Sequence, residues 1–297
     1  MTGTLDGTAP LHYSPSQSQR TTLAVIYISG ADAADFLHGQ FSGDVRALRA
    51  GQSLLTAWCN PKGRVLFLPR LLRDGAGEFY ALLAKDQAAG FVKRLRMFTL
   101  RAKVQIEDRC DNLGVLVSDG VVSSDDRALA HAINGERRWL VVPQHHIAAL
   151  LQTHAVPLLD DNSALLADIR RGEPLLDGRL TEQFLPQELN LDILAGVSFN
   201  KGCYPGQEIV ARVKFRGAVK RRVQRFCLAA PTPPTPGTRL LGSDQVAHGT
   251  VLAAASCADQ QCEVLAVVDL DAGELHLAGA DHAVLSGLPL PYASTGA

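Results

Sequence analysis

One stretch of thirteen residues constrains the fold of this chain more than any other. It runs from Asn200 to Arg212 and reads Asn-Lys-Gly-Cys-Tyr-Pro-Gly-Gln-Glu-Ile-Val-Ala-Arg. Gly202 and Gly206 permit backbone angles that are closed to other residues, and Pro205 fixes φ and removes an amide donor. Because a plain turn needs only one glycine or proline, this concentration predicts a tight, stiff loop that lets another group approach the main chain.

A cysteine lies inside this loop. Lys201 precedes Cys203 by two residues, and Arg212 follows it more distantly. A nearby cation favours thiolate over thiol, and the thiolate is the form that acts as a nucleophile or a metal ligand. The spacing alone leaves two alternatives open: a reactive thiol, or a small half-buried cysteine in a turn that precedes a strand or a helix.

The run Lys-Gly-Cys-Tyr-Pro-Gly-Gln-Glu, followed by Ile-Val-Ala-Arg, closely resembles the signature of the YgfZ family. These proteins are folate-binding relatives of the glycine cleavage T-protein, an aminomethyltransferase, and are implicated in iron–sulfur cluster maintenance and tRNA modification. The likeness extends from about Leu23 to Tyr292 and includes the pair Asp44-Val45. It implies an α+β fold: a T-protein-like multi-domain ring with antiparallel sheets and a small C-terminal β-barrel.

The same resemblance, together with composition, divides the chain into domains. Residues 1–20 are rich in Thr, Ser, Pro and Gln, and we expect a disordered tail there. Residues 21–222 are expected to form the folate-binding region as two α+β lobes, with the signature loop at 200–212. Short apolar runs separated by Gly and Asp turns predict that 223–297, which contains the proline-rich connection 231–237, forms the β-barrel.

Local patterns predict individual elements. Strands are expected over 23–29, 51–58 and 65–72, with tight turns between successive β segments. A helix is expected over 164–171, ending at Gly172, because glycine readily adopts the left-handed conformation that terminates helices.

Composition excludes several classes of protein. The 297 residues, 46% hydrophobic and 20% charged with a net charge of −1, are typical of a globular protein with two or three domains. No run approaches the roughly 18 apolar residues of a membrane span, and residues 1–20 lack the apolar core of a secretory signal. The six cysteines include no Cys-x-x-Cys pair, so no zinc or iron–sulfur site of its own is predicted. We therefore expect a cytoplasmic protein with reduced thiols and no membrane partner.

A basic run begins at the signature. Between Lys201 and Arg225 there are eight cations and one acid, Glu208. In a chain of nearly zero net charge this run forms a local positive patch. It is either the solvated, charge-protected edge of a sheet, or a site for an anion such as a phosphate backbone or a polyglutamate tail. The second alternative places tRNA on the basic run 212–225.

The resemblance implies roles for individual residues of the loop. Cys203 is expected to be the reactive thiol, and Lys201 to keep it partly ionised. Tyr204, Gln207 and Glu208 are expected to shape the pocket or to hydrogen-bond within it.

Tetrahydrofolate, or a related folate, is the cofactor that the resemblance implies. Arg212, Lys214 and Arg216 are expected to neutralise the carboxylates of this ligand. Some family members place tryptophans that are associated with folate binding in the first strand and before a later helix. The corresponding positions here are Leu23 and Ala164, which reduces the stacking surface.

The implied function is support for the assembly or repair of iron–sulfur enzymes, including radical enzymes that modify tRNA. Two alternatives stay open: a tetrahydrofolate-dependent aminomethyltransferase and a non-catalytic RNA-binding module. Against the first, the signature departs from that of the T-protein and the chain is short for that enzyme. Against the second, few aromatic residues are interleaved with the basic run, namely Tyr204, Phe215 and Phe226.

Overall fold

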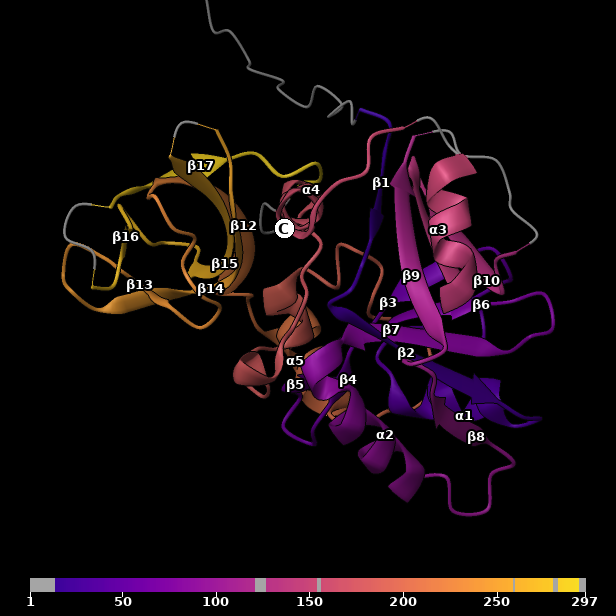
Figure 1. Cartoon of the computed structure of the whole chain (residues 1–297). Helices are drawn as coiled ribbons and strands as arrows, with labels where there is room; N and C mark the ends of the chain where they lie inside the picture. The colour runs from indigo at the N-terminus through magenta and orange to yellow at the C-terminus, as the bar shows by residue number, and fades with distance from the viewer. Residues whose placement is uncertain (1–13, 121–126, 154–155, 259, 280–282, 294–297) are drawn as a thin grey trace, which may run out of the picture.

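The computed structural model describes residues 14–120, 127–153, 156–258, 260–279 and 283–293. Within these residues the chain forms antiparallel sheets of four, six and five strands and a separate two-stranded pair. The six-stranded sheet, built from the C-terminal part of the chain, lies apart from the other two, with α4 and α5 between them (Figure 1). Among the described residues, no helix has the length and apolar character that crossing a membrane requires.

The five-stranded sheet carries the first lobe. Its order is β3 (Ser53–Leu55), β6 (Arg70–Arg73), β7 (Phe79–Ala84), β2 (Leu23–Ser29) and β8 (Gln105–Asp108). Successive side chains of a strand point to opposite faces, and β2 is apolar on both. Ile26 and Ile28 pack toward the helices, whereas Val25 and Tyr27 pack toward the four-stranded sheet. The strand predicted over 23–29 is therefore confirmed as a buried central strand.

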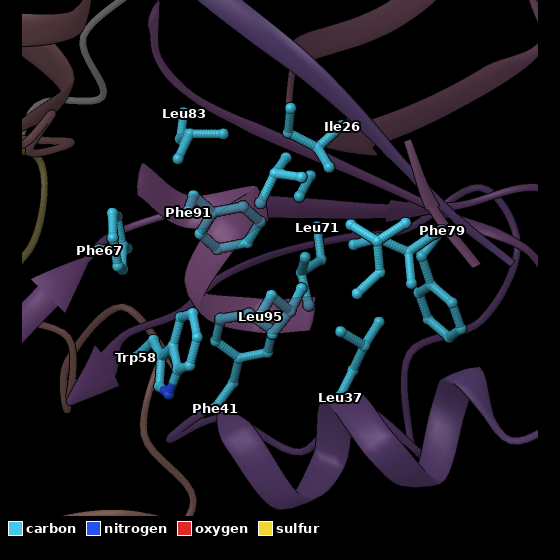
Figure 2. Packing of buried hydrophobic residues seen from close by; sticks show 14 of the residues in the cluster. Ile26, Leu37, Phe41, Trp58, Phe67, Leu71, Phe79, Leu83, Phe91 and Leu95 are labelled. Atoms are coloured by element: carbon cyan, nitrogen blue, oxygen red, sulfur yellow. The ribbon is translucent and has the colours of Figure 1, made fainter. Parts of the chain in front are cut away.

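Aromatic rings fill the space between this sheet and its helices, α1 (Ala33–Gln40) and α2 (Ala88–Met97). Trp58 lies at the centre of the group, with ring centroids 6.1 Å from Phe41 and 5.8 Å from Phe91, both edge-on (Figure 2). Such edge-to-face pairs add stability beyond the area that they bury. The group fixes the C-terminal end of α1, where Phe41 is the capping residue.

Two strands expected to be continuous are broken. The segment 51–58 divides into β3 and β4 (Trp58–Cys59), which belong to different sheets, and 65–72 divides into β5 (Val65–Phe67) and β6. Pro69, which separates β5 from β6, has no N–H to donate to a strand ladder. Because of these breaks, each segment contributes one strand to the five-stranded sheet of the first lobe and another to the separate β4–β5 pair.

The four-stranded sheet has the order β1 (Ser16–Gln19), β9 (Leu113–Asp119), β11 (Arg137–Pro143) and β10 (Ala130–Asn134). Helix α3 (Gln144–Thr153) packs on its outer face through Ile147 and Leu150. Its inner face packs against the five-stranded sheet, where Val117 and Trp139 share a core cluster with Val25.

The expectation of a disordered tail over 1–20 is wrong for its last residues. Ser16–Gln19 pairs with β9, and the Gln17 backbone also donates to the Pro157 carbonyl at 2.9 Å. Arg20 is only 6% exposed. The Gln17 side chain donates to the Leu151 carbonyl at 2.8 Å, so a strand made only of polar residues is held by partners far along the chain. Residues 1–13 lie outside the described part of the chain.

The C-terminal sheet has the order β16 (His276–Leu277), β13 (Arg239–Leu241), β14 (Ala247–Ser256), β15 (Gln261–Asp269), β12 (Arg221–Ala229) and β17 (Leu285–Leu288). It curls so that its edges meet: the backbone of Leu285 donates to Leu275 at 2.9 Å, and that of Leu277 to Ala283 at 3.2 Å. This curled sheet corresponds to the expected small β-barrel. Strand β12 begins at Arg221, so the predicted boundary at 222 falls inside it.

Helices α4 (Asp161–Arg171) and α5 (Gln207–Arg216) connect the lobes, with short 3-10 turns at Gly178–Leu180 and Pro186–Leu189 between them; a further 3-10 turn, Lys85–Gln87, leads into α2. The Asp160 carboxylate caps α4 by accepting from the Ser163 N–H at 2.7 Å, and Gly172 ends it with φ of 64°. The predicted helix and its glycine stop are confirmed. Helix α5 begins directly after Gly206, so the signature loop leads into a helix.

Candidate functional site

A cavity of about 430 Å³ lies between the first lobe, β10 and the loop that precedes the signature. Its walls come from segments far apart in the sequence: the stretch after α1, strands β3 and β6, the end of β10, the residue after Gly172, and residues 194–198. Its polar lining consists of Asp44, Gln52, Ser53, Arg70, Asn134, Glu173 and Ser198. Its apolar lining includes Leu48, Leu54, Leu55, Ile133 and Leu194. Polar groups around an apolar pocket of this size are typical of a small-molecule site.

The charged groups of the cavity are held in place. Arg70 donates to Glu173 at 2.7 Å, and its guanidinium carbon lies 4.6 Å from the centre of the Trp139 ring. Burial lowers the pKa of Arg70, and the carboxylate of Glu173 opposes that effect. Asp44 is more exposed, and one of its oxygens accepts from the Ala47 N–H at 3.2 Å. The cavity therefore offers one ion-paired carboxylate and one that remains accessible.

A smaller cavity of about 30 Å³ adjoins the large one and shares Leu55, Arg70 and Glu173 with it. Two buried donors on its wall, Trp139 Nε1 and Arg20 Nη1, have no hydrogen-bond partner among the described residues. A buried donor without a partner is costly, so this end of the cavity favours an acceptor atom from water or from a ligand.

Buried charges surround this deep end. Asp168 accepts from Arg20 on one oxygen and from Arg137 at 2.6 Å on the other. Arg137 also donates to both oxygens of Asp119, at 3.0 and 3.1 Å, and Arg171 joins the same carboxylate at 2.6 Å. Burial alone raises the pKa of Asp168, but its arginine partners outweigh burial and lower that pKa to about 2. The cluster ties β1, β9, β11 and α4 together.

The ammonium group of Lys201 lies against the end of α1. It donates to the main-chain carbonyls of His38, Phe41 and Gly43, the last two at 2.6 and 2.9 Å. Burial lowers its pKa to about 8, while Asp44 acts in the opposite direction. Since an ammonium has three N–H donors, all three are used by these carbonyls. Lys201 therefore fixes the backbone that leads directly into Asp44.

Cys203, unlike Lys201, has an exposed side chain. It does not line the 430 Å³ cavity. The hydrogen-bond donors of Lys201, which were expected to support its thiolate, point to carbonyl groups of α1 and the residues after it. The loop thus exposes the sulfur, whereas Lys201 hydrogen-bonds the backbone that leads to Asp44 in the cavity wall.

The other predicted residues of the loop are distributed between core and surface. Tyr204 is 6% exposed, burial raises its pKa, and its ring centre lies 5.2 Å from the ammonium of Lys201. Gln207 is half-buried, and Glu208 is exposed in the first turn of α5. Neither they nor Tyr204 line the 430 Å³ cavity. They belong to the support of the loop and to its outer surface.

The close backbone approach predicted from the signature is confirmed at Gly206. Its φ is +79°, and an added Cβ would lie 2.4 Å from the carbonyl oxygen of Asn60 and 2.7 Å from the Cα of Gly63. The group that comes near the main chain is therefore the turn between β4 and β5. This contact seats the signature against the centre of the molecule.

The basic run separates into two groups. Three of its arginines are neutralised by buried carboxylates: Arg221 by Glu188 at 2.9 Å, Arg222 by Asp192 at 3.0 Å and Arg225 by Glu263 at 3.1 Å. The exposed cations have no ion pair within the described residues: Arg212, Lys214, Arg216 and Lys220. None of these four lines the 430 Å³ cavity.

Asp44, Arg70 and Glu173 have no predicted role from the sequence. Asp44 carried a signal as part of the Asp-Val pair that the resemblance includes, and Glu173 carried one within the run Ile-Arg-Arg-Gly-Glu-Pro, which resembles a stretch of the T-protein family. The two positions that correspond to family tryptophans also lie outside the cavity lining: Ala164 is 2% exposed within α4, and Leu23 lines the smaller cavity near Trp139. The indole of Trp139 thus lines the same small cavity as Leu23, a position where some family members have a tryptophan.

Curated relatives match nearly the whole chain, although no protein-family model matches it. The tRNA-modifying protein YgfZ of Yersinia enterocolitica is 32% identical over 300 residues, covering 92% of this chain and 91% of that protein. The proteins of the same name from Escherichia coli strain SE11 and Sodalis glossinidius are 32% and 30% identical over 296 and 298 residues, covering 91% of this chain and 90% of each relative.

Among solved structures, glycine cleavage system aminomethyltransferase T from Bartonella henselae matches with a TM-score of 0.72. The match covers 94% of this chain and 86% of that one at 15% identity, so it concerns the fold. The T-protein-like α+β fold with antiparallel sheets, expected from the signature, is confirmed. With identity of 30% or more to curated relatives over about nine-tenths of its length, the chain belongs to the YgfZ family.

Proposed function

We propose that this protein binds a tetrahydrofolate-type ligand in the 430 Å³ cavity and supports iron–sulfur enzymes that modify tRNA. The observation that carries the proposal is the cavity itself, which has a mixed apolar and polar lining with two carboxylates and adjoins a smaller cavity with unpartnered buried donors, in a T-protein-like fold. The relatives named tRNA-modifying protein YgfZ support the connection to tRNA.

The donor and acceptor groups of the cavity fit a folate. A reduced pterin presents an amino group and ring N–H donors, which suit the carboxylates of Asp44 and Glu173. Its ring carbonyl is an acceptor, which suits the unpartnered donors of Arg20 and Trp139 at the deep end. The leucine side chains provide apolar walls for the flat rings, and the volume is within the range of about 300–1000 Å³ that is usual for such ligands.

When bound, tetrahydrofolate supplies a carrier for one-carbon units. The protein's own residues would bind and orient it. Arg70 holds Glu173 in position, and Lys201 holds the backbone before Asp44. Lys201 belongs to the signature and Asp44 to the cavity wall. The signature therefore supports ligand binding indirectly, by holding the backbone that positions Asp44.

Cys203 is assigned in this proposal to contact with client enzymes. Its exposed thiol is available to another protein or to a cluster in transit, whereas Cys59 and Cys262 are buried. In a strain that lacks the native protein, Cys203→Ala should fail to restore the activity of radical tRNA-modifying enzymes, although the variant folds normally. Full restoration by Cys203→Ala would remove the thiol from the proposal.

Calorimetric titration with tetrahydrofolate tests the ligand directly. Saturable binding is expected, with a loss of roughly 10-fold or more in affinity for Glu173→Gln, because a charged acceptor is replaced. No saturable binding at millimolar ligand would contradict the proposal. Release of ammonia and methylenetetrahydrofolate from an aminomethyl-lipoyl carrier would instead identify an aminomethyltransferase, the activity named for the protein that shares the fold.

A further inference from the structure

Helix α5 exposes an aromatic side chain on a basic surface. Phe215, in the last turn, is 69% exposed, although Arg212, one turn before it on the same side of the helix, and the next residue, Arg216, are charged. A helix of a globular protein normally turns such a ring toward the core, as α5 does with Val210. Most of the Phe215 ring therefore lies outside the packed core.

A second ring joins Phe215 from outside the helix. Phe199, which precedes the signature loop, lies with its ring centre 5.8 Å from that of Phe215 at an angle of 76°. It is half-buried against the central core, and the ammonium of Lys214 lies 5.9 Å from its ring centre. The fold thus adds an aromatic residue to the basic run that the sequence of the run does not contain. Phe199 anchors the pair, and Phe215 is its exposed member.

The charge around this pair is uncompensated. Arg212, Arg216 and Lys220 are exposed and have no carboxylate partner within the described residues. The single acid of the helix, Glu208, lies in the opposite end turn, one turn before Arg212. The platform, by which we mean Phe199, Phe215 and the cations Arg212, Lys214, Arg216 and Lys220, is therefore positive as well as aromatic.

We propose that the platform binds single-stranded RNA, with a base stacked on Phe215 and adjacent phosphates on the cations. A stacking surface among several exposed cations is the arrangement that binds unpaired nucleic acid, because every base has a π-face and every nucleotide a phosphate. Duplex RNA offers phosphates but no free base face, so it would use only the charges. The inference deepens the proposed connection to tRNA by naming the surface, and it requires no folate.

Fluorescence anisotropy with a short labelled single-stranded RNA tests this inference on the full chain. Phe215→Leu should weaken binding about 10-fold, since it keeps the apolar volume but removes the ring, whereas Phe215→Trp should bind at least as well as the native protein. Arg212→Ala with Arg216→Ala should reduce the slope of log K against log salt by about 1.4, or about 0.7 for each lost phosphate contact. Arg101→Ala, an exposed cation beyond the end of α2, is the matched control and should leave binding and slope unchanged.

Three results would overturn the inference. They are equal affinity for a duplex of the same sequence, unchanged binding by Phe215→Leu, and stronger binding of a polyglutamate peptide than of RNA, which would identify the platform as a surface for an acidic protein. The same variants are titrated with tetrahydrofolate. If a platform variant loses RNA binding but still binds folate, the proposed folate site in the cavity is unaffected. If the native chain does not bind folate, the proposed function fails, but the RNA result still tests the platform.

Discussion

Asp168 is a buried carboxylate whose ionisation depends on two arginine partners. Arg20 and Arg137 each donate to one of its oxygens, and its side chain is 10% exposed. A buried ion pair adds little to stability by itself, because desolvation opposes the attraction, but removal of one partner leaves uncompensated buried charge. We therefore expect Asp168→Asn to lower the free energy of unfolding by about 3–5 kcal/mol, measured by urea denaturation at pH 7.

The matched control for this prediction is Asp35→Asn. Asp35 pairs with Arg46 at 2.6 Å, but both side chains are more than half exposed, at 70% and 58%. Removal of such a surface pair should change the unfolding free energy by no more than about 0.5 kcal/mol. Equal effects of the two substitutions would mean that Asp168 is not a structural centre of the molecule.

The same carboxylate predicts a pH dependence. Its pKa in the folded protein is about 2, below the value of about 3.9 that an unfolded chain gives an aspartate. The stabilisation from its ionised form is complete above the unfolded value and is lost as pH falls toward about 2. The difference in unfolding free energy between the native protein and Asp168→Asn should therefore shrink between pH 4 and pH 2.

Lys201 illustrates what local sequence can and cannot predict about a residue. Its position two residues before Cys203 suggested an electrostatic partnership with the thiol. Its hydrogen-bond acceptors instead lie 158 to 163 residues earlier in the chain, at the end of α1. A spacing rule detects neighbours along the chain, but tertiary folding selected the acceptors of this ammonium group.

Among the elements, α5 begins after Gly206, a glycine whose replacement should be costly. Gly206 has φ of +79°, which is strained for other residues, and its Cα faces the backbone of the turn at Asn60 and Gly63. Backbone atoms cannot rotate away as a flexible side chain can. We expect Gly206→Ala to lower the free energy of unfolding by about 3 kcal/mol, from left-handed strain together with overlap, as measured by chemical denaturation.

Gly202 provides the comparison within the same loop. Its φ lies outside the left-handed region, and an added Cβ would have no heavy atom within 4 Å. Gly202→Ala should leave the unfolding free energy unchanged within about 0.5 kcal/mol, or raise it slightly, because alanine restricts the unfolded chain. If both substitutions were tolerated, the loop would not depend on its approach to the β4–β5 turn.

Elements with local signals were predicted well. Strand β2 has an apolar pattern on both faces, and α4 has a capping aspartate and a terminal glycine, so short-range rules suffice for both. Strand β1 was missed because Ser16–Gln19 contains only polar residues, and its stability comes from pairing with β9 about a hundred residues later. The elements that could be predicted were those whose apolar pattern or capping residues lie within their own sequence.

At the scale of the whole molecule, one part of the candidate site could be predicted from local sequence and another could not. The signature could be recognised from the sequence, since its residues follow one another within a single short stretch. The cavity could not, because Asp44, Glu173 and Ser198 meet only when α1, α4 and the loop before the signature are assembled. The platform is intermediate: its cations were visible as a run, but Phe199 joins Phe215 only through the fold.

Obstruction of the cavity tests whether that assembly creates the ligand site. Ala47 is exposed and lines the 430 Å³ cavity, so Ala47→Trp should place an indole across its opening without removing a buried contact. Tetrahydrofolate at about 100 times its dissociation constant should stabilise the native protein by about 2.7 kcal/mol, seen as a rise in Tm. Ala47→Trp should abolish that rise, whereas Ala76→Trp, at an exposed turn between β6 and β7, should retain it. If Ala47→Trp kept the full rise in Tm, the ligand would bind elsewhere on the molecule.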